Sequence, residues 1–285
     1  MDFAGRLGPD DGRYLVRSSS GDAEHVLVVG GVDGLAAGFR RGRRRRGRAR
    51  PAGQEPERPP IPVTRLTVIR PGAFATEEDA DAWLRDTATS ETDRAELVDA
   101  ALLIVNRALH AHGVAAQDPH GAGVSATAAI EIRIGYGSGD ELADGRWAEA
   151  VGVELGAGRR HRTEALRPQE RLAAVLGGRE PTDACETLLL RARGDLDEGR
   201  SREAALQLRV GLEALLAEIR PGGVEAPGAA EQTADLAALE GRRSITGTAA
   251  NEALAGELSG TRADELAETL RLCERVLRRR RILAQ

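Results

Sequence analysis

The sequence predicts an α+β fold: a small antiparallel β-sheet with two covering helices, followed by an all-helical, bundle-like C-terminal half. Two patterns predict it. Before residue 156, short segments alternate apolar and polar side chains, as strands with one wet face do, and two helical segments lie among them. After residue 162, every apolar pattern repeats at helical spacing. We therefore expect an α+β domain over residues 1–160 and a helical domain over residues 161–285.

Three segments near the N-terminus have strand character. Residues 13–17 and 24–29 are short runs rich in Val, Leu and Tyr, joined by a hairpin turn of Ser, Gly and Asp. Residues 63–70 are a third candidate strand, because their side chains alternate between the two faces of an extended segment. The insert at residues 38–60 is rich in Arg and Pro. Because Pro removes a backbone donor and like charges repel, we expect this insert to be disordered.

Two capping signals predict two consecutive helices. Thr76 precedes Asp79, and Ser90 precedes Asp93, at the three-residue spacing at which a hydroxyl caps a helix. The second helix has one apolar face, and Gly113 predicts its end. The face comprises Val98, Leu102, Val105, Leu109 and His112.

Strand character returns over residues 126–155, where large side chains alternate with polar or small ones. The large ones are Ile130, Ile132, Ile134 and Tyr136, then Trp147, Val151, Val153 and Leu155. Strands with one apolar and one polar face are typical of antiparallel sheets. We expect them to merge with the first sheet, so that the helix over residues 91–112 covers one face.

About six helices are expected between residues 166 and 281, forming a bundle. Residues 183–219 form a helical hairpin that resembles one tetratricopeptide unit, which implies close packing at Ala204 and Gly211. The apolar stripe of the last helix, Thr261–Arg281, covers this hairpin or dimerises. The hairpin positions are Leu188, Ala192, Gly199, Ala204, Leu208 and Gly211, and the stripe is Leu266, Leu270, Cys273 and Leu277.

The composition excludes several chemistries. All 40 basic residues are Arg, so the chain has no Lys for a phosphate-binding loop, a Schiff base or a kinase ATP anchor. Two cysteines, Cys185 and Cys273, are too few for a disulfide framework or a thiolate zinc site. The N-terminal segment does not resemble a secretory signal and no long apolar run is present, so we expect a cytoplasmic protein with no membrane partner.

One glycine-rich string has the pattern of a cofactor loop. GYGSGD, residues 135–140, follows a strand-like run, and Glu154 follows later. This string resembles the S-adenosylmethionine loop of Rossmann-like methyltransferases, which implies a cofactor-binding turn and an acid on the ribose. The chain departs from that family at Arg133, where the family has an acid, and it has no further strands to complete a doubly wound sheet. The competing interpretation is a Gly-rich connection within a β-hairpin.

Three of the five histidines lie close together beside an acid: His110, His112 and His120 with Asp118. Imidazole and carboxylate groups at short spacing can bind a transition metal or act as acid and base. Because residues two apart on a helix point about 200° apart, His110 and His112 converge only on unwound backbone. The competing interpretation is a helix C-terminus at which histidine opposes the helix dipole.

The arginine tract is the sharpest feature of the composition. Its eight guanidinium groups are those of Arg40, Arg41, Arg43, Arg44, Arg45, Arg46, Arg48 and Arg50. Guanidinium groups pair with phosphates, so the tract favours binding of nucleic acid or another polyanion. Only Phe39 is aromatic there, so no stacking platform for bases is present. Because a chain without Lys is typical of a high-GC bacterium, the competing interpretation is a solvated spacer.

No group of residues stands out as a catalytic constellation, so the sequence favours a cytoplasmic interaction or adaptor protein that needs no cofactor. Its helical half would bind a protein partner or itself, and its arginine tract would bind an anion. The alternative is a nucleic-acid-associated protein that contacts phosphates through the tract independently of base sequence. A third hypothesis is an enzyme, either metal-dependent at the histidines or methyltransferase-like at the glycines.

Overall fold

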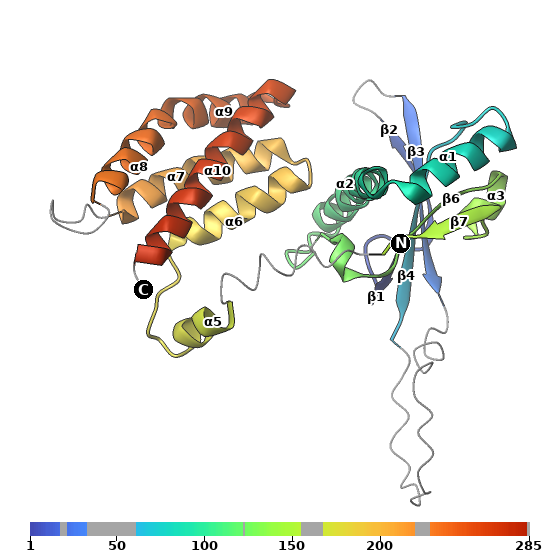
Figure 1. The fold of residues 1–285 in the computed structure, drawn as a ribbon, viewed down its shortest axis with the longest axis horizontal. Coiled ribbons are helices and arrows are strands. Elements are labelled where there is room, and N and C mark those ends of the chain that lie inside the picture. Colours follow the sequence, from blue (N-terminus) through green and yellow to red (C-terminus); the bar gives the residue numbers. More distant parts are fainter. Residues whose placement is uncertain (18–21, 33–60, 122, 155–167, 220–228, 284–285) are drawn as a thin grey trace, which may run out of the picture. The chain divides into compact units, whose positions relative to one another are not determined.

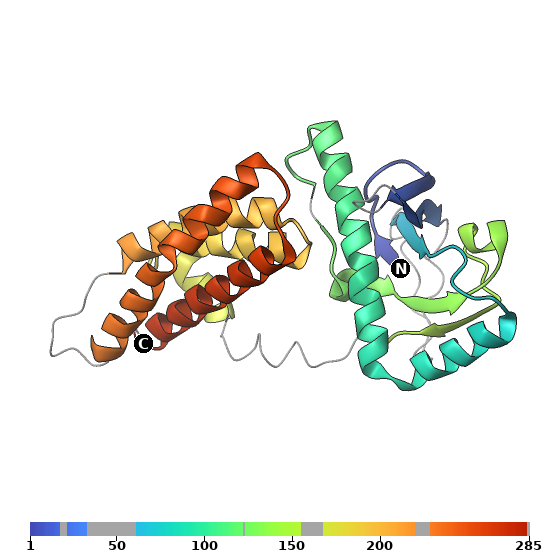
Figure 2. The same cartoon turned by 90° about the horizontal axis from the view of Figure 1, so that it is seen from above.

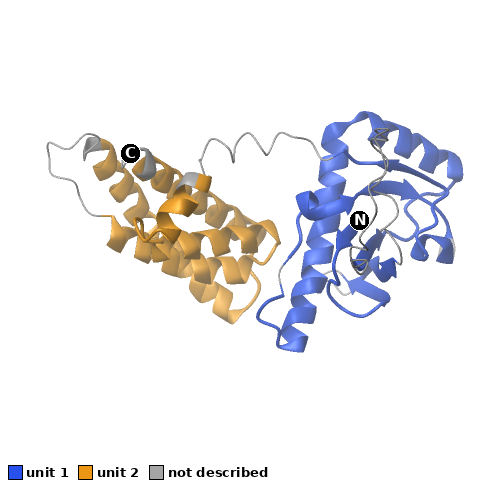
Figure 3. Cartoon of the chain, turned by 90° about the horizontal axis from the view of Figure 1, so that it is seen from below, with its two compact units in different colours: residues 1–156 blue, residues 157–285 orange. Residues whose placement is uncertain are grey.

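The computed structural model describes residues 1–17, 22–32, 61–121, 123–154, 168–219 and 229–283 (Figure 1). The chain divides into two compact units, Met1–Gly156 and Ala157–Gln285 (Figure 3). We call them the α+β unit and the helical unit. The predicted insert at residues 38–60 lies outside the described residues.

A five-stranded sheet forms the centre of the α+β unit. Its strand order is β2-β3-β4-β1-β5, and every neighbouring pair is antiparallel. The predicted strands correspond to β2 (Gly12–Arg17), β3 (Ala23–Val32) and β4 (Val63–Ile69). The sequence did not predict β1 (Asp2–Ala4), whose three residues are too short for a recognisable alternation.

The strand predicted over residues 130–136 is divided between two sheets. Its first part is β5 (Ala129–Glu131), which joins the main sheet, and its second is β6 (Arg133–Tyr136), which pairs with β7 (Glu149–Gly152). The expected merger therefore holds for β5 alone, and β6 and β7 form a separate two-stranded sheet. The division follows from packing, because Ile132 is buried against the main sheet while Tyr136 packs against Ala80 and Leu84.

Two helices cover the sheets of this unit: α1 (Glu77–Thr89) and α2 (Glu91–Ala116) (Figure 2). Both caps form as predicted, since the hydroxyls of Thr76 and Ser90 each accept the backbone N–H three residues on, both at 3.2 Å. One core joins α2 to the sheet. It contains Phe3, Leu27, Val29 and Leu66 from the strands and Val98, Leu102, Val105 and Leu109 from α2.

The end of α2 differs from the prediction. Gly113 remains helical, and α2 continues to Ala116, where Gln117 takes the left-handed conformation (φ 54°). The carbonyl of Gly113 then accepts the Asp118 N–H at 2.9 Å, which satisfies one of the last backbone acceptors. His112, expected on the apolar face, is exposed.

The helical unit contains six helices among its described residues, as predicted. They are α5 (Pro168–Leu176), α6 (Ala184–Asp197), α7 (Ser201–Glu218), α8 (Ala229–Gly241), α9 (Arg243–Ala255) and α10 (Gly260–Leu283). The predicted hairpin is α6–α7. A side chain at Gly211 would lie only 3.1 Å from Leu189, so glycine allows the two helices to approach closely. No described helix is both long and apolar enough to traverse a lipid bilayer.

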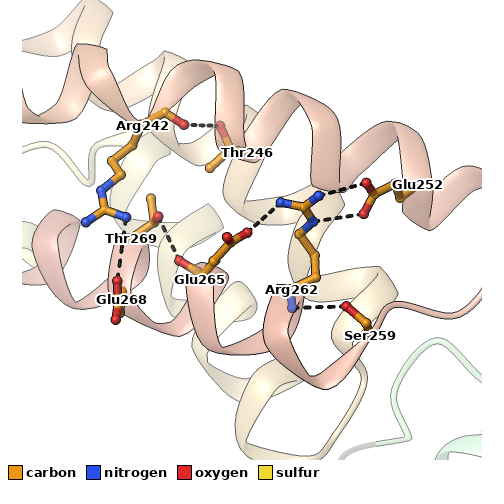
Figure 4. A network of polar contacts seen from close by, with 8 residues as sticks. All are labelled: Arg242, Thr246, Glu252, Ser259, Arg262, Glu265, Glu268 and Thr269. Carbon is orange, nitrogen blue, oxygen red and sulfur yellow. Dashed lines mark hydrogen bonds and ion pairs between the residues drawn. The ribbon is translucent and has the colours of Figure 1, made fainter.

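The last helix covers the hairpin with its predicted stripe, since Leu266, Leu270 and Cys273 are fully buried in the core shared with α6 and α7. Figure 4 shows how polar contacts join α10 to α9. Arg262 of α10 donates to both carboxylate oxygens of Glu252 at 2.8 Å. The Ser259 hydroxyl accepts the Arg262 N–H, so α10 begins at Gly260, one residue earlier than expected.

Candidate functional site

The structure separates the predicted histidine group. His110 and His112 lie on regular helix in α2, and both are exposed. Asp118 follows the helix, and its carboxylate accepts the His120 backbone N–H at 2.9 Å, which stabilises the turn. Among the described residues, these four are not a group whose ligand atoms lie within 4.8 Å of one another. The metal-dependent and acid–base hypotheses therefore gain no geometric support.

The glycine-rich string lies in an antiparallel hairpin. Gly135 and Tyr136 end β6, and the connection to β7 contains the short helix α3 (Gly139–Ala143). A side chain at Gly135 would clash with the Glu149 carbonyl on the paired strand, so glycine is required there for packing. The Tyr136 hydroxyl donates to Asp81, and this hydrogen bond, together with burial, raises the pKa of Tyr136 to about 12. This arrangement agrees with the hairpin interpretation of residues 135–140. A cofactor-binding turn would instead follow a strand of a parallel sheet.

Between the α1–α2 junction and β7 lies a depression of about 240 Å³. It is lined by Ala88, Arg94, Val151, Gly152 and Glu154. The Arg94 guanidinium donates to the carbonyls of Thr87 and Ala88 and so caps the end of α1. This use of the arginine is structural.

One group of potential metal ligands occurs among the described residues, with Cys185 buried and its two acids half-buried. Oxygens of Asp183 and Glu218 and the sulfur of Cys185 lie within 4.8 Å of one another at the start of α6. Glu218 accepts the Cys185 backbone N–H at 3.4 Å, and Arg280 lies 3.5 Å from Asp183. Burial and the nearby Glu218 carboxylate raise the pKa of the Cys185 thiol, so the thiol is protonated at neutral pH. These contacts cap α6 and join it to α7 and α10.

A different surface of the helical unit combines exposed apolar and basic groups. Arg193 of α6 donates to both carboxylate oxygens of Glu274 of α10, at 2.8 and 3.1 Å, which fixes the two helices side by side. Leu190 lies one turn before Arg193 and is 74% exposed. Together with Arg271, Arg275 and Arg278 of α10, Leu190 makes up what we call the α6–α10 surface.

The three arginines of this surface follow one stripe of α10, at spacings of four and three residues, and all are exposed. None forms an ion pair with a carboxylate of the described residues. Arg278 donates only to the carbonyl of Glu274, at 3.3 Å. Other arginines of α10 are paired: Arg262 with Glu252, Arg279 with Asp235 and Arg280 with Asp183. The α6–α10 surface therefore presents cationic groups that the described fold does not neutralise.

The short helix α5 also carries exposed apolar side chains. Arg171 of α5 forms an ion pair with Glu186, which lies one turn before Leu190 on α6. Leu172 and Leu176 of α5 are both exposed, one turn apart. Exposed apolar side chains gathered beside charged ones are typical of protein-binding surfaces.

Sequence reasoning missed this surface, although it noted the arginine tract with its eight arginines. Arg40, Arg41, Arg43, Arg44, Arg45, Arg46, Arg48 and Arg50 all lie outside the described residues. A signal for the α6–α10 surface was present in the spacing of Arg271, Arg275 and Arg278, which places them on one helical face opposite the apolar stripe. Comparison of the chain with protein-family models, with curated proteins and with solved structures finds no match.

Proposed function

We propose that this is a non-catalytic interaction protein whose helical unit binds an acidic, apolar segment of another protein on the α6–α10 surface. One observation carries the proposal: three exposed arginines follow one stripe of α10 without a carboxylate partner in the described chain, and the exposed Leu190 lies one turn from Arg193, which binds Glu274 of the same helix. Carboxylates of a partner would form charge-assisted hydrogen bonds with the guanidinium groups. An apolar side chain of the partner would cover Leu190.

The chemistry of the surface favours a protein over a nucleic acid. Proteins that bind single-stranded nucleic acid combine basic groups with aromatic side chains on which the bases stack. Residues 157–285 contain no Phe, Tyr or Trp. The apolar side chain beside the arginines is instead a leucine, which a protein partner can bury.

The binding experiment uses a fluorescent amphipathic peptide of alternating Glu and Leu turns, a matched peptide with Gln for Glu, and a labelled single-stranded oligonucleotide. We expect the acidic peptide to bind the full-length protein. Reversal of the three charges in Arg271→Glu, Arg275→Glu and Arg278→Glu is expected to weaken that binding more than about tenfold. Leu190→Ser is expected to weaken it less, because only apolar contact is lost.

The control variant carries Arg6→Glu, Arg70→Glu and Arg85→Glu, three exposed arginines of the α+β unit. It changes the net charge by the same amount, so it is expected to bind as the unaltered protein does. Equal loss in both triple variants would show a general charge effect and contradict the proposed surface. Preferential binding of the oligonucleotide would favour the nucleic-acid alternative.

The arginine tract makes a separate prediction. If Arg40–Arg50 binds polyanions, deletion of those residues should reduce retention of the protein on immobilised DNA at low salt. The measurement is the salt concentration at which the protein elutes. Unchanged elution after the deletion would contradict a nucleic-acid role for the tract, and it leaves the α6–α10 proposal unaffected.

A further inference from the structure

Helix α2 is apolar on its outer side as well as on the side that packs against the sheet. The inner side contributes Val98, Leu102, Val105 and Leu109 to the core. On the outer side, Leu97, Leu103 and Val114 are 37%, 42% and 65% exposed. Ala100, Ile104 and Ala111 lie between them: Ala100 is three residues from both Leu97 and Leu103, Ile104 is seven residues after Leu97, and Ala111 is three residues before Val114. We call these six residues the outer ridge of α2. A helix that is apolar all round is expected to be covered on both sides.

The charges beside the outer ridge are separated along the helix. Its first nine residues carry four acids, all of them exposed, and one base, Arg94, whose guanidinium donates to carbonyls at the end of α1. From Ala100 to Ala116 there is no acid, and the charged or titratable residues are His110, His112 and Arg107, whose guanidinium donates to the Arg17 carbonyl at 3.3 Å. The surface is therefore acidic at one end of the ridge and basic at the other.

We infer that the outer ridge of α2 is a dimer interface, at which two copies of this chain pair their α2 helices antiparallel across a twofold axis near Leu103. An antiparallel copy places the acidic end of each helix against the basic end of the other, whereas a parallel copy places like charges together. The helix dipoles also oppose each other favourably in the antiparallel pair. A twofold axis lets one surface bind itself, so each favourable contact occurs twice.

The charged residues along α2 are placed symmetrically about Leu103, as this arrangement requires. Asp99 and Arg107 each lie four residues from Leu103, and Glu96 and His110 each lie seven. In an antiparallel pair centred on Leu103, Asp99 of one copy lies level with Arg107 of the other, and Glu96 lies level with His110. Leu103 packs against its own equivalent, with Ile104 and Ala100 beside it, as in the apolar seam of a helix pair.

The test measures the mass of the full-length protein by sedimentation over a range of concentrations. We expect a monomer–dimer equilibrium. Leu103→Glu should raise the dissociation constant more than about tenfold, because it places two carboxylates together at the axis. Leu254→Glu is the matched control, since Leu254 is an exposed leucine of α9, and it should leave the dissociation constant unchanged.

A charge exchange tests the antiparallel orientation. Asp99→Arg or Arg107→Asp alone should weaken the dimer, and the double variant should restore it, because opposite charges then face each other again. A monomer at every concentration, as expected if another part of the chain covers the ridge, would overturn the inference. A dimer insensitive to Leu103→Glu would do the same. Failure of the double variant to restore the dimer would exclude this pairing, provided circular dichroism shows the native helix content.

Discussion

The two units each contain an arginine that binds a carboxylate through two parallel hydrogen bonds, but the two pairs differ in environment. In the α+β unit, Arg65 of β4 donates to both oxygens of Asp2 at 2.9 and 2.7 Å. In the helical unit, Arg193 donates in the same way to Glu274. The arginine side chains are almost equally exposed, at 27% and 26%, whereas Asp2 is 5% exposed and Glu274 33%.

The two pairs therefore differ mainly in how deeply the carboxylate is buried. Burial by itself would raise the pKa of Asp2, but the hydrogen bond and charge of Arg65 outweigh it and lower the pKa below its ordinary value. Arg65, with a smaller contribution from Arg133, therefore favours the ionised form of Asp2 inside the sheet. Glu274 keeps part of its contact with water, so its pair adds less to stability.

The α+β unit contains every aromatic residue of the chain, including Trp83 and Trp147. Tryptophan fluorescence therefore reports the unfolding of this unit. Most of the described helical residues, and so most of the far-ultraviolet circular dichroism, belong to the helical unit, with a smaller share from α1 and α2. The effects on the two pairs can thus be measured with different probes in the same protein.

The largest expected effect is that of Asp2→Asn. This change leaves the half-buried Arg65 guanidinium without the buried carboxylate that binds it, and it should lower the free energy of unfolding by about 3 kcal/mol. Urea unfolding followed by tryptophan fluorescence measures it. The double variant Asp2→Asn with Arg65→Met should recover part of the loss, because no unpaired charge remains. A loss below about 1 kcal/mol in the single variant would show that water already solvates this pair.

A second prediction concerns how the stability contributed by Asp2 changes at acidic pH. Since the pKa of Asp2 is lowered in the folded state, its contribution is complete at neutral pH and is lost as the pH falls through the folded value. The stability difference between the native protein and Asp2→Asn should therefore begin to shrink below about pH 4. Fluorescence-monitored urea unfolding at several acidic pH values measures this difference. A difference that does not change with pH would contradict the assignment to Asp2.

The smallest effect is expected for Glu274→Gln. The carboxylate is partly hydrated and the amide can still accept one hydrogen bond, so the free energy of unfolding should fall by about 1 kcal/mol or less. Circular dichroism at the helical minimum during urea unfolding measures it. A loss as large as that for Asp2→Asn would mean that the burial of the acid does not decide the strength of these pairs.

Local signals in the sequence predicted much of the fold. The caps at Thr76 and Ser90 depend on residues three positions away, so they could be recognised without the tertiary structure. The α6–α7 hairpin followed from helical spacing and Gly211. The division between β5 and β6 was not predictable, because both continue one alternating pattern and differ only in the distant strand with which each pairs.

The candidate surfaces were harder to predict for a related reason. The run Arg278–Arg281 was visible in the sequence as a basic cluster. The rotation of α10 about its own axis decides which of these arginines meets a carboxylate. Arg279 binds Asp235 and Arg280 lies against Asp183, whereas Arg278 is exposed. Exposure of Leu190 likewise depends on how α6 packs, because a leucine on a helix is more often buried.

The position of β1 has a consequence for the order in which the protein assembles. This strand lies between β4 and β5, so its first residues pair with Arg65 on one side and with Glu131 on the other. The α6–α7 hairpin instead closes through the three residues between Asp197 and Ser201. Because distant pairings form more slowly than adjacent ones, refolding from urea should restore the helical dichroism before the tryptophan signal. During synthesis, β1 therefore leaves the ribosome before both strands with which it pairs.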